Sequence, residues 1–159
     1  MAEITAEIIT HLREYLYVLF VSMLPVIEVK GAIPLGIARG LQPAATFLTA
    51  LVGSCLPAPF VILLFKPFLK WLRSLPFKIC RAFADWTERH ALKRKGKISN
   101  TSLIFLFIFV AIPLPGTGVW TGSMIAALLD IRLKRAIPAI WLGNVVASLL
   151  LLALGVVVF

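Results

Sequence analysis

The sequence predicts an all-α integral membrane protein in which a re-entrant helical hairpin plus a transmembrane helix occurs twice, as an inverted repeat, together with interfacial amphipathic helices. Three observations predict this fold class. The 159-residue chain is 60% hydrophobic, and its mean hydropathy of +0.99 exceeds that of soluble domains. Two apolar stretches are long enough to span a bilayer, and two others are interrupted by proline and glycine. We therefore expect a single membrane domain, 1–159.

The N-terminal segment 3–16 has the pattern of an amphipathic helix, with glutamates on one face and Ile4, Ile8 and Leu12 on another. We expect it to lie at the membrane interface. Segment 17–41 follows, and its two short apolar arms surround a broken centre, which predicts re-entrant hairpin 1. The residues that break this centre are Pro25, Gly31, Pro34 and Gly36, and the first three form the expected hairpin tip.

Two continuous apolar stretches, 43–65 and 136–159, have the length of transmembrane helices. Pro57 and Pro59 are expected to kink the first of them. Each stretch also contains a polar residue that is expected to hydrogen-bond the broken backbone of the hairpins. These supporting polar residues are Ser54 and Asn144.

The connector 66–100 is basic and amphipathic. Before and after Pro76, cations and apolar residues recur at helical spacing, which predicts two short interfacial helices with Trp71 and Trp86 at headgroup level. Membrane lipids with anionic headgroups are the expected partner of this connector. A solvated basic turn, 93–97, is expected after the second helix.

Segment 103–129 is apolar except for a break between Pro113 and Gly122. Two prolines and three glycines in ten residues cannot continue a regular helix, and lipid cannot hydrogen-bond the freed N–H and C=O groups. We expect re-entrant hairpin 2 here, with its break buried or lining a wet cavity, as in transporter binding sites. A half-helix that begins near Thr121 would present free N–H groups to an anion, whereas the alternative is a packed hairpin with Trp120 as filler. The tip and candidate anion-binding residues are Pro113, Pro115, Gly116, Thr117, Gly118, Trp120, Thr121 and Gly122.

A shift of 90 positions reveals an internal repeat. It aligns Pro25 with Pro115 and Ser54 with Asn144, although the overall identity is weak. The repeated order of hairpin and span is better evidence than the residue matches.

The placement of charge selects the topology. Two basic segments, 66–100 and 130–135, hold 13 of the 16 Lys and Arg, that is, all except Arg13, Lys30 and Arg39. If only the two continuous apolar stretches cross the membrane, both segments face one side, in line with the positive-inside rule, and the hairpins enter from opposite faces. We expect a multi-pass protein of the cell inner (plasma) membrane with the connector 66–100 in the cytoplasm.

Glu28 is the only carboxylate within a segment expected at membrane depth. An acid there is costly, so the first hypothesis is a proton carrier or a substrate anchor. The alternatives are an ion pair with Lys30 or Arg39, or a cap on a half-helix. Lys30 could also attract an anionic group, whereas Arg39 is expected to snorkel to the interface. These three are the candidate substrate and proton-coupling residues.

The residues argue against an enzyme, a nucleic-acid-binding protein and an ATP-driven pump. The apolar segments contain no Ser-His-Asp or Cys-His set, and no nucleotide motif occurs. Cys55 and Cys80 have no metal-site spacing, so neither a metal nor a cofactor is expected. Most of the excess positive charge behind the net charge of +9 lies between apolar stretches, where loops of membrane proteins are basic.

The stretches 28–34 and 113–122 resemble those of the small multidrug export protein family, and the resemblance covers most of the chain. That family is similar to the broader DedA/SNARE-associated (VTT) superfamily. The resemblance implies paired re-entrant hairpins in inverted repeats and lipid flipping or scrambling, including undecaprenyl phosphate recycling. It also implies that Glu28 and the Gly-Thr-Gly hairpin form the central site. DedA-type proteins are longer and carry an arginine motif near the second hairpin, for which only Arg132 or Arg135 could stand in here.

We therefore expect a transporter or lipid flippase of the DedA-like superfamily that moves a small amphipathic or lipid-linked, phosphate-bearing substrate, with proton coupling through Glu28. Two alternatives stay open. One is a small multidrug exporter of cationic compounds, and the other is a non-transporting membrane-structuring or partner-binding protein. Because two spans and two hairpins are few elements to enclose a polar pathway, we also expect a homodimer.

Overall fold

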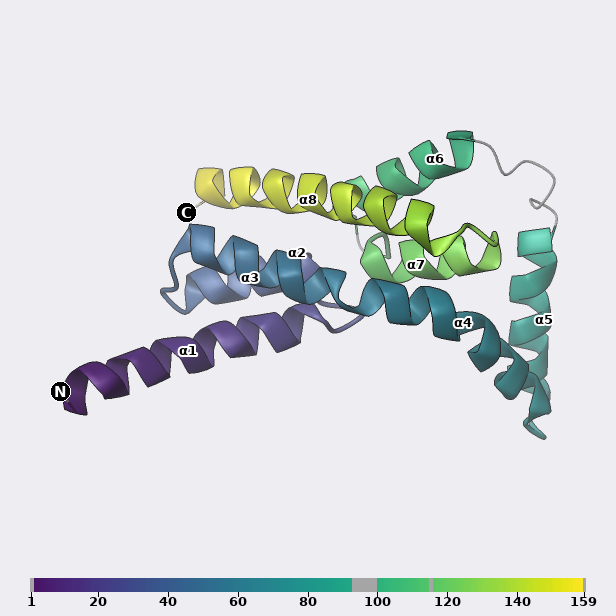
Figure 1. Ribbon diagram of the computed structural model, residues 1–159, viewed down its shortest axis with the longest axis horizontal. Coiled ribbons are helices and arrows are strands. Elements are labelled where there is room, and N and C mark those ends of the chain that lie inside the picture. Colours follow the sequence, from purple (N-terminus) through teal and green to yellow (C-terminus); the bar gives the residue numbers. More distant parts are fainter. Residues whose placement is uncertain (1, 93–99, 115, 159) are drawn as a thin grey trace.

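The computed structural model describes the backbone of residues 2–92, 100–114 and 116–158 (Figure 1). Within these ranges, side chains are described from 11 to 153 except at 80, 83, 87, 88, 90–92, 100 and 101. The described residues form α-helices joined by turns and contain no strand. Two helical stretches, Pro43–Ser74 and Leu133–Ala153, are long and apolar enough to cross a membrane.

The first half of the chain forms a hairpin beside a long interrupted helix. α1 (Ala2–Ser22) and α2 (Glu28–Ala38) are joined by the turn 23–27, and α3 (Pro43–Cys55) continues almost directly into α4 (Pro57–Ser74). The first three helices pack against one another around a buried apolar cluster. Its members are Val18, Val21, Val29, Ala32, Ile33, Leu41 and Ala50.

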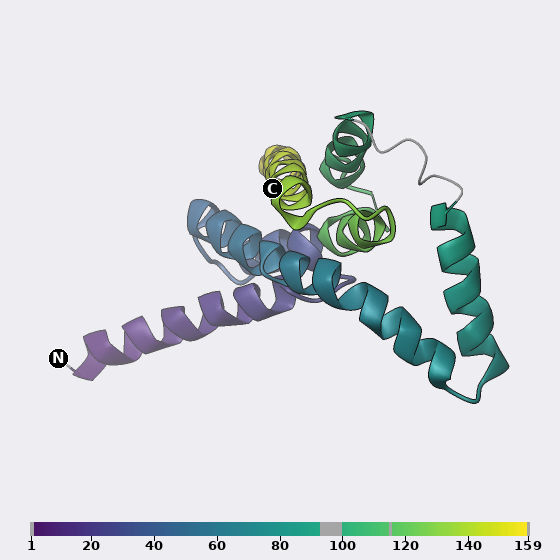
Figure 2. The same cartoon turned by 45° about the vertical axis from the view of Figure 1, so that its right-hand side comes forward.

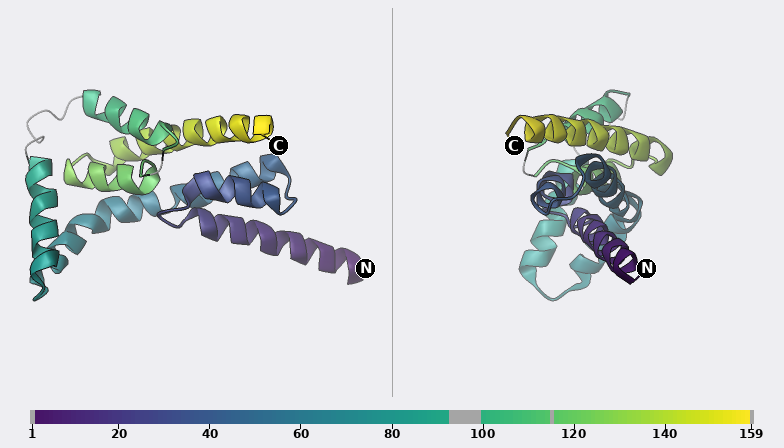
Figure 3. Two further views of the ribbon diagram at one scale, coloured as in Figure 1. Left: turned by 180° about the vertical axis from the view of Figure 1, so that it is seen from behind. Right: turned by 90° about the vertical axis from the view of Figure 1, so that its left-hand side faces the viewer.

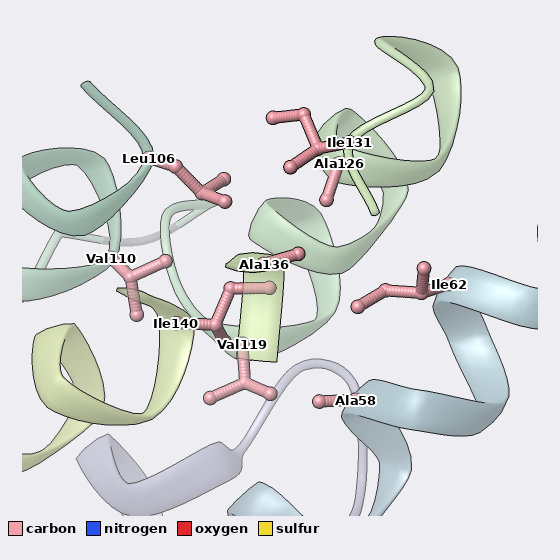
Figure 4. Close-up of a cluster of buried hydrophobic side chains, with 9 residues drawn as sticks. All are labelled: Ala58, Ile62, Leu106, Val110, Val119, Ala126, Ile131, Ala136 and Ile140. Atoms are coloured by element: carbon pink, nitrogen blue, oxygen red, sulfur yellow. The ribbon is translucent and has the colours of Figure 1, made fainter. Parts of the chain in front are cut away.

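The second half repeats this arrangement after α5 (Lys78–Leu92), which packs on α4. α6 (Asn100–Ala111) and α7 (Val119–Leu128) form the second hairpin, and α8 (Leu133–Val158) packs against both. A second apolar cluster joins these helices to α4 (Figure 4). It consists of Ala58, Ile62, Leu106, Val110, Val119, Ala126, Ile131, Ala136 and Ile140.

The ends of α2 and α7 have the same backbone geometry at positions 90 residues apart. The N–H of Leu41 donates to the carbonyl oxygen of Gly36 at 3.1 Å, and the N–H of Ile131 donates to that of Ala126 at 3.0 Å. The residue before each donor has a positive φ, 75° in the first half and 56° in the second. Each half therefore closes its hairpin onto the following helix by the same turn.

The two hairpins approach the middle of the molecule from opposite ends (Figures 1 and 3). α1 comes from the end where both chain termini lie, and α6 comes from the other end. The long stretch from α3 to α4 runs in roughly the opposite direction to α8. α5 and the corner 130–135 lie together at the end away from the termini.

The first hairpin differs from the expected one in its boundaries. The expected helix 3–16 is not separate, because no proline or glycine interrupts α1 before its end at Ser22. The break is confined to 23–27, which contains Pro25. The other residues expected in the broken centre lie inside α2, and they are Gly31, Pro34 and Gly36.

The absence of a side chain at Gly36 serves helix packing. A Cβ there would collide with the side chain of Thr46 on α3 and lie 3.2 Å from a methyl of Val18 on α1. Gly36 therefore lets α2 fit between its two neighbours, which explains why a glycine that the sequence marks as a breaker is helical.

The first long helix does not end at residue 65, because α4 continues to Ser74. One of the two interfacial helices expected in the connector is therefore the end of α4, and α5 is the other. Only Leu56 interrupts the stretch, directly before Pro57, as expected from a proline that lacks an N–H donor. α6 and α8 each begin three residues earlier than expected. The expected basic turn 93–97 lies outside the described residues.

Gly143 lies where α8 contacts α6. A Cβ there would lie 2.7 Å from the carbonyl oxygen of Phe107 and 2.9 Å from Cβ of Val110. We predict that Gly143→Ala forces the helices apart and lowers the free energy of unfolding by about 1–3 kcal/mol, measured by unfolding in detergent. Gly40→Asn is the control, because nothing lies within 4 Å of a Cβ there and asparagine tolerates the positive φ. Equal stability of both variants would contradict the close α6–α8 contact.

Candidate functional site

The breaks of the two hairpins meet at the middle of the molecule. The indole Nε1–H of Trp120, in the first turn of α7, donates to the carbonyl oxygen of Met23 at 3.0 Å. Met23 begins the turn between α1 and α2, where helical hydrogen bonding stops. The side chain of one hairpin thus hydrogen-bonds the backbone that the other hairpin leaves free.

Glu28 forms the reverse connection, from hairpin 1 to hairpin 2. Its carboxylate accepts a hydrogen bond from the N–H of Trp120 at 3.0 Å and lies close to the N–H of Val119. These are the first N–H groups of α7, which have no partner within the helix. A carboxylate at this position also interacts favourably with the positive end of the helix dipole. Glu28 is only 4% exposed, so it is an internal cap of α7.

The approach of this carboxylate requires a glycine at position 118. Gly118 has a φ of +147°, which other residues rarely adopt. A Cβ there would collide with the carboxylate oxygens of Glu28. Glu28 itself has a φ of +46°, which is uncommon outside glycine and indicates a residue held in place by its surroundings.

Lys30 binds the other side of the same break. Its ammonium group donates to the carbonyl oxygens of Leu114 and Thr117, and its Nζ lies 3.3 Å from Oγ1 of Thr117. An ammonium group has three donors. All three therefore have an acceptor in the loop between α6 and α7, where regular helical hydrogen bonding is lost.

Thr117 closes this loop from within. Its Oγ1 lies 2.6 Å from the carbonyl oxygen of Ile112 and 2.8 Å from that of Leu114, and it accepts from the N–H of Leu114 at 3.2 Å. Backbone groups of the loop before α7 are thus hydrogen-bonded by the hydroxyl group of Thr117 and by the ammonium group of Lys30. We call Glu28, Lys30 and Thr117 with their backbone partners the central clasp.

A second set of hydrogen bonds joins the two long helices near the interruption at Leu56. Nδ2 of Asn144 donates to Oγ of Ser54 at 2.7 Å and lies 3.4 Å from Sγ of Cys55. Nε1 of Trp141 donates to the carbonyl oxygen of Cys55 at 3.3 Å. In a regular helix the N–H four residues later would bind this carbonyl, but that residue is a proline. Trp141 therefore replaces the missing backbone donor.

The structure differs in detail from some of the sequence-based alternatives for the candidate residues. Among the ion pairs of the described residues, none joins Glu28 to Lys30 or Arg39. Arg39 instead binds Glu14 at 2.6 Å and lies over the ring of Tyr17, so it is not simply snorkelling. Of the alternatives for Glu28, the half-helix cap agrees with the geometry, and the capped helix belongs to the other hairpin.

The hairpin 2 residues are only partly brought together. α7 begins at Val119, two positions before the expected Thr121, and its first N–H groups are already bound by Glu28. Gly122 lies inside α7, and Pro115 is outside the described residues. Ser54 and Asn144 bind each other instead of the hairpin backbone.

Sequence reasoning missed the roles of Trp141, Met23 and Glu14. The shift of 90 positions could have found part of the site, since it pairs Glu28 with Gly118 as well as Ser54 with Asn144. Both pairs are in contact across the two halves. No group of three or more His, Cys, Asp or Glu that could hold a metal ion occurs among the described residues.

Comparison with known proteins identifies one family. Residues 28–150 match the family model described as "Putative small multi-drug export protein". The match begins at Glu28 and includes the central clasp, α3 to α5 and α8 up to residue 150. No curated protein and no solved structure matches the chain.

Thr117→Val is the sharpest test of the central clasp, because valine keeps the shape and removes the hydroxyl group. We predict that it lowers the free energy of unfolding by about 1–3 kcal/mol, since loop N–H and C=O groups lose a partner. Thr117→Ser keeps the hydroxyl group and should be close to the parent protein. Thermal unfolding in detergent compares the three. If valine and serine behave alike, the hydroxyl group does not hold the loop.

Proposed function

This chain belongs to the family described as "Putative small multi-drug export protein", and from that premise we propose that it is a membrane transporter. Its substrate in this proposal is small and amphipathic, or lipid-linked and phosphate-bearing. Two apolar stretches that are long enough to cross a membrane support a location in the membrane. The structure also contains two broken hairpins whose breaks meet, an arrangement typical of transporter binding sites.

The observation that carries the proposal is the binding of Glu28 to the N-terminus of α7. A buried charged group is costly in a membrane and is a functional hypothesis by default. Here the carboxylate occupies N–H donors that could equally bind an anionic group of a substrate. Protonation of Glu28 removes its charge and weakens these bonds, which are worth about 1.5–3 kcal/mol each when charged. Proton uptake would thus free the N-terminus of α7 to bind a substrate anion. In this way Glu28 would couple proton uptake to substrate binding.

The helix lengths support a re-entrant, inverted repeat as part of this proposal. α2 has 11 residues and α7 has 10. At 1.5 Å per residue each is about 15 Å long, half of the roughly 30 Å hydrocarbon core, so neither spans alone. The approach of the hairpins from opposite ends agrees with this arrangement (Figure 1). We also propose that this family is related to the DedA/VTT superfamily and that the protein forms a homodimer.

Export of cationic compounds is the second candidate, and one observation favours it. The carbonyl oxygens of Leu114 and Thr117 already hold an ammonium group, that of Lys30. If Lys30 moved away, the same acceptors would face a substrate cation. In the first candidate function the substrate anion replaces the carboxylate of Glu28. In the second the substrate cation replaces the ammonium group of Lys30.

Reconstituted flux distinguishes the candidates. We predict that the parent protein moves a lipid-linked phosphate in proteoliposomes with a pH gradient. Glu28→Gln should lower this flux about tenfold or more, because glutamine cannot take up and release a proton and so cannot switch the charge-assisted interaction on and off. A cationic dye is tested in parallel. Glu14→Gln is the matched control, since it neutralises a carboxylate of α1 that lies outside the clasp.

Full proton-coupled flux in Glu28→Gln would contradict the proposed role of Glu28 in proton coupling. Movement of the dye alone would select the exporter. If correctly folded parent protein moved neither substrate, a membrane-structuring or partner-binding role would replace transport.

The proposed topology has α5 and the corner 130–135 in the cytoplasm and the exposed residues of α1 outside. We predict that, in a background without Cys55 and Cys80, an impermeant thiol reagent added to intact cells labels Arg13→Cys but not Arg81→Cys. Both side chains are exposed. Arg81→Cys should react only after the membrane is opened, because the positive-inside rule places the basic end in the cytoplasm. Labelling of both positions from one side would rule out this topology.

A further inference from the structure

One end of the molecule is strongly basic. The last turns of α4, the whole of α5 and the corner 130–135 come together there, away from the chain termini (Figures 1 and 3). We call the exposed cations of this end the basic shelf. Its members are Lys70, Lys78, Arg81, Arg89, Arg132, Lys134 and Arg135.

The acidic side chains described at this end are held by cations outside the basic shelf. Oδ1 of Asp85 lies 3.0 Å from Nε of Arg73, and Asp130 forms an ion pair with Lys66. Among the described side chains, no ion pair involves a member of the shelf. The shelf therefore presents its positive charge outward.

Large apolar side chains are exposed beside these cations. Ile79 and Trp86, seven positions apart on α5, share one face of the helix and are 83% and 57% exposed. Trp71, near the end of α4, is 57% exposed. Tryptophan beside cations is typical of residues at the headgroup level of a bilayer.

The orientation of α5 agrees with this environment. In Figure 2 the axis of α8 points nearly toward the viewer, and the axis of α5 lies roughly in the plane of the picture. Because α8 is one of the two stretches able to cross a membrane, α5 runs across the crossing direction at the end of the span. Ala84 of α5 is fully buried, and the ion pair between Arg73 and Asp85 ties α5 to α4. The shelf is therefore a docked part of the fold.

We propose that the basic shelf is a binding surface for the headgroups of acidic phospholipids, with Ile79, Trp71 and Trp86 at the boundary of the acyl chains. A nucleic acid would match the charge, but it would leave these apolar side chains in water. The proposal combines the end of α4 and α5 with the corner 130–135, which residues 93–129 separate from α5 in the sequence, into one surface. It requires only that the chain lies in a bilayer and does not depend on transport.

The test uses the full chain in nanodiscs and follows the fluorescence of Trp86, obtained as the difference between the parent protein and Trp86→Phe. Brominated phosphatidylglycerol and brominated phosphatidylcholine are compared as quenchers at the same mole fraction. We expect the acidic lipid to quench Trp86 more strongly. The preference should fall steeply at about 1 M salt, where the Debye length is about 3 Å.

A variant measures the contribution of the cations. Lys78→Gln with Arg81→Gln should weaken the preference for phosphatidylglycerol by about fivefold for each charge removed. Arg13→Gln is the matched control, because it removes an exposed cation of α1, away from the shelf. Equal quenching by both lipids in the parent protein would overturn the proposal without any variant. An unchanged preference in the double variant would overturn the role of the shelf.

Discussion

The structure depends on one constraint, which is that the backbone groups freed by helix breaks need hydrogen-bond partners where lipid offers none. Four side chains meet this need. Glu28 binds the first N–H groups of α7, Lys30 binds the carbonyl groups before it, and Trp120 binds the carbonyl group of Met23. Trp141 binds the carbonyl group that Pro59 leaves free in α3. Each of these contacts joins one half of the chain to the other.

These reciprocal hydrogen bonds act together with apolar packing to join the two halves into one body. One apolar cluster lies within the first half, whereas the other includes Ala58 and Ile62 of α4 and therefore joins the two halves. Apolar burial favours contact between the halves, but it is non-directional and does not decide which polar groups meet. The hydrogen bonds between the hairpin breaks fix their relative position. A conformational change that moves one hairpin must therefore exchange these bonds for others, with a substrate, water or protons.

Close backbone approach is the second requirement of this arrangement. Gly118 makes room for the carboxylate of Glu28, Gly143 for α6, and Gly36 for α3. Only the first of these glycines borders a break. Glycine in such a chain therefore has two distinct uses, the interruption of a helix and the contact between helices. Sequence alone does not separate them, which is why Gly31 and Gly36 were expected to break a segment that is helical.

The sequence by itself determined the all-helical class, the two long apolar stretches, the break between α6 and α7 and the basic character of the connector. These features follow from local composition and spacing, and proline or glycine at 25 and 113–118 acts within a few residues. The re-entrant topology, the coupling role of Glu28 and the dimer stay predictions.

Only the tertiary structure decided which backbone groups Glu28, Lys30 and Trp120 hold. Their partners lie between 84 and 97 positions away, so no local periodicity could indicate them. It also decided that α4 extends past residue 65, since a helix continues wherever packing and solvent satisfy its side chains. Local sequence determines where a helix can break, whereas the other half of the chain supplies the hydrogen-bond partners of the backbone groups that the break leaves free.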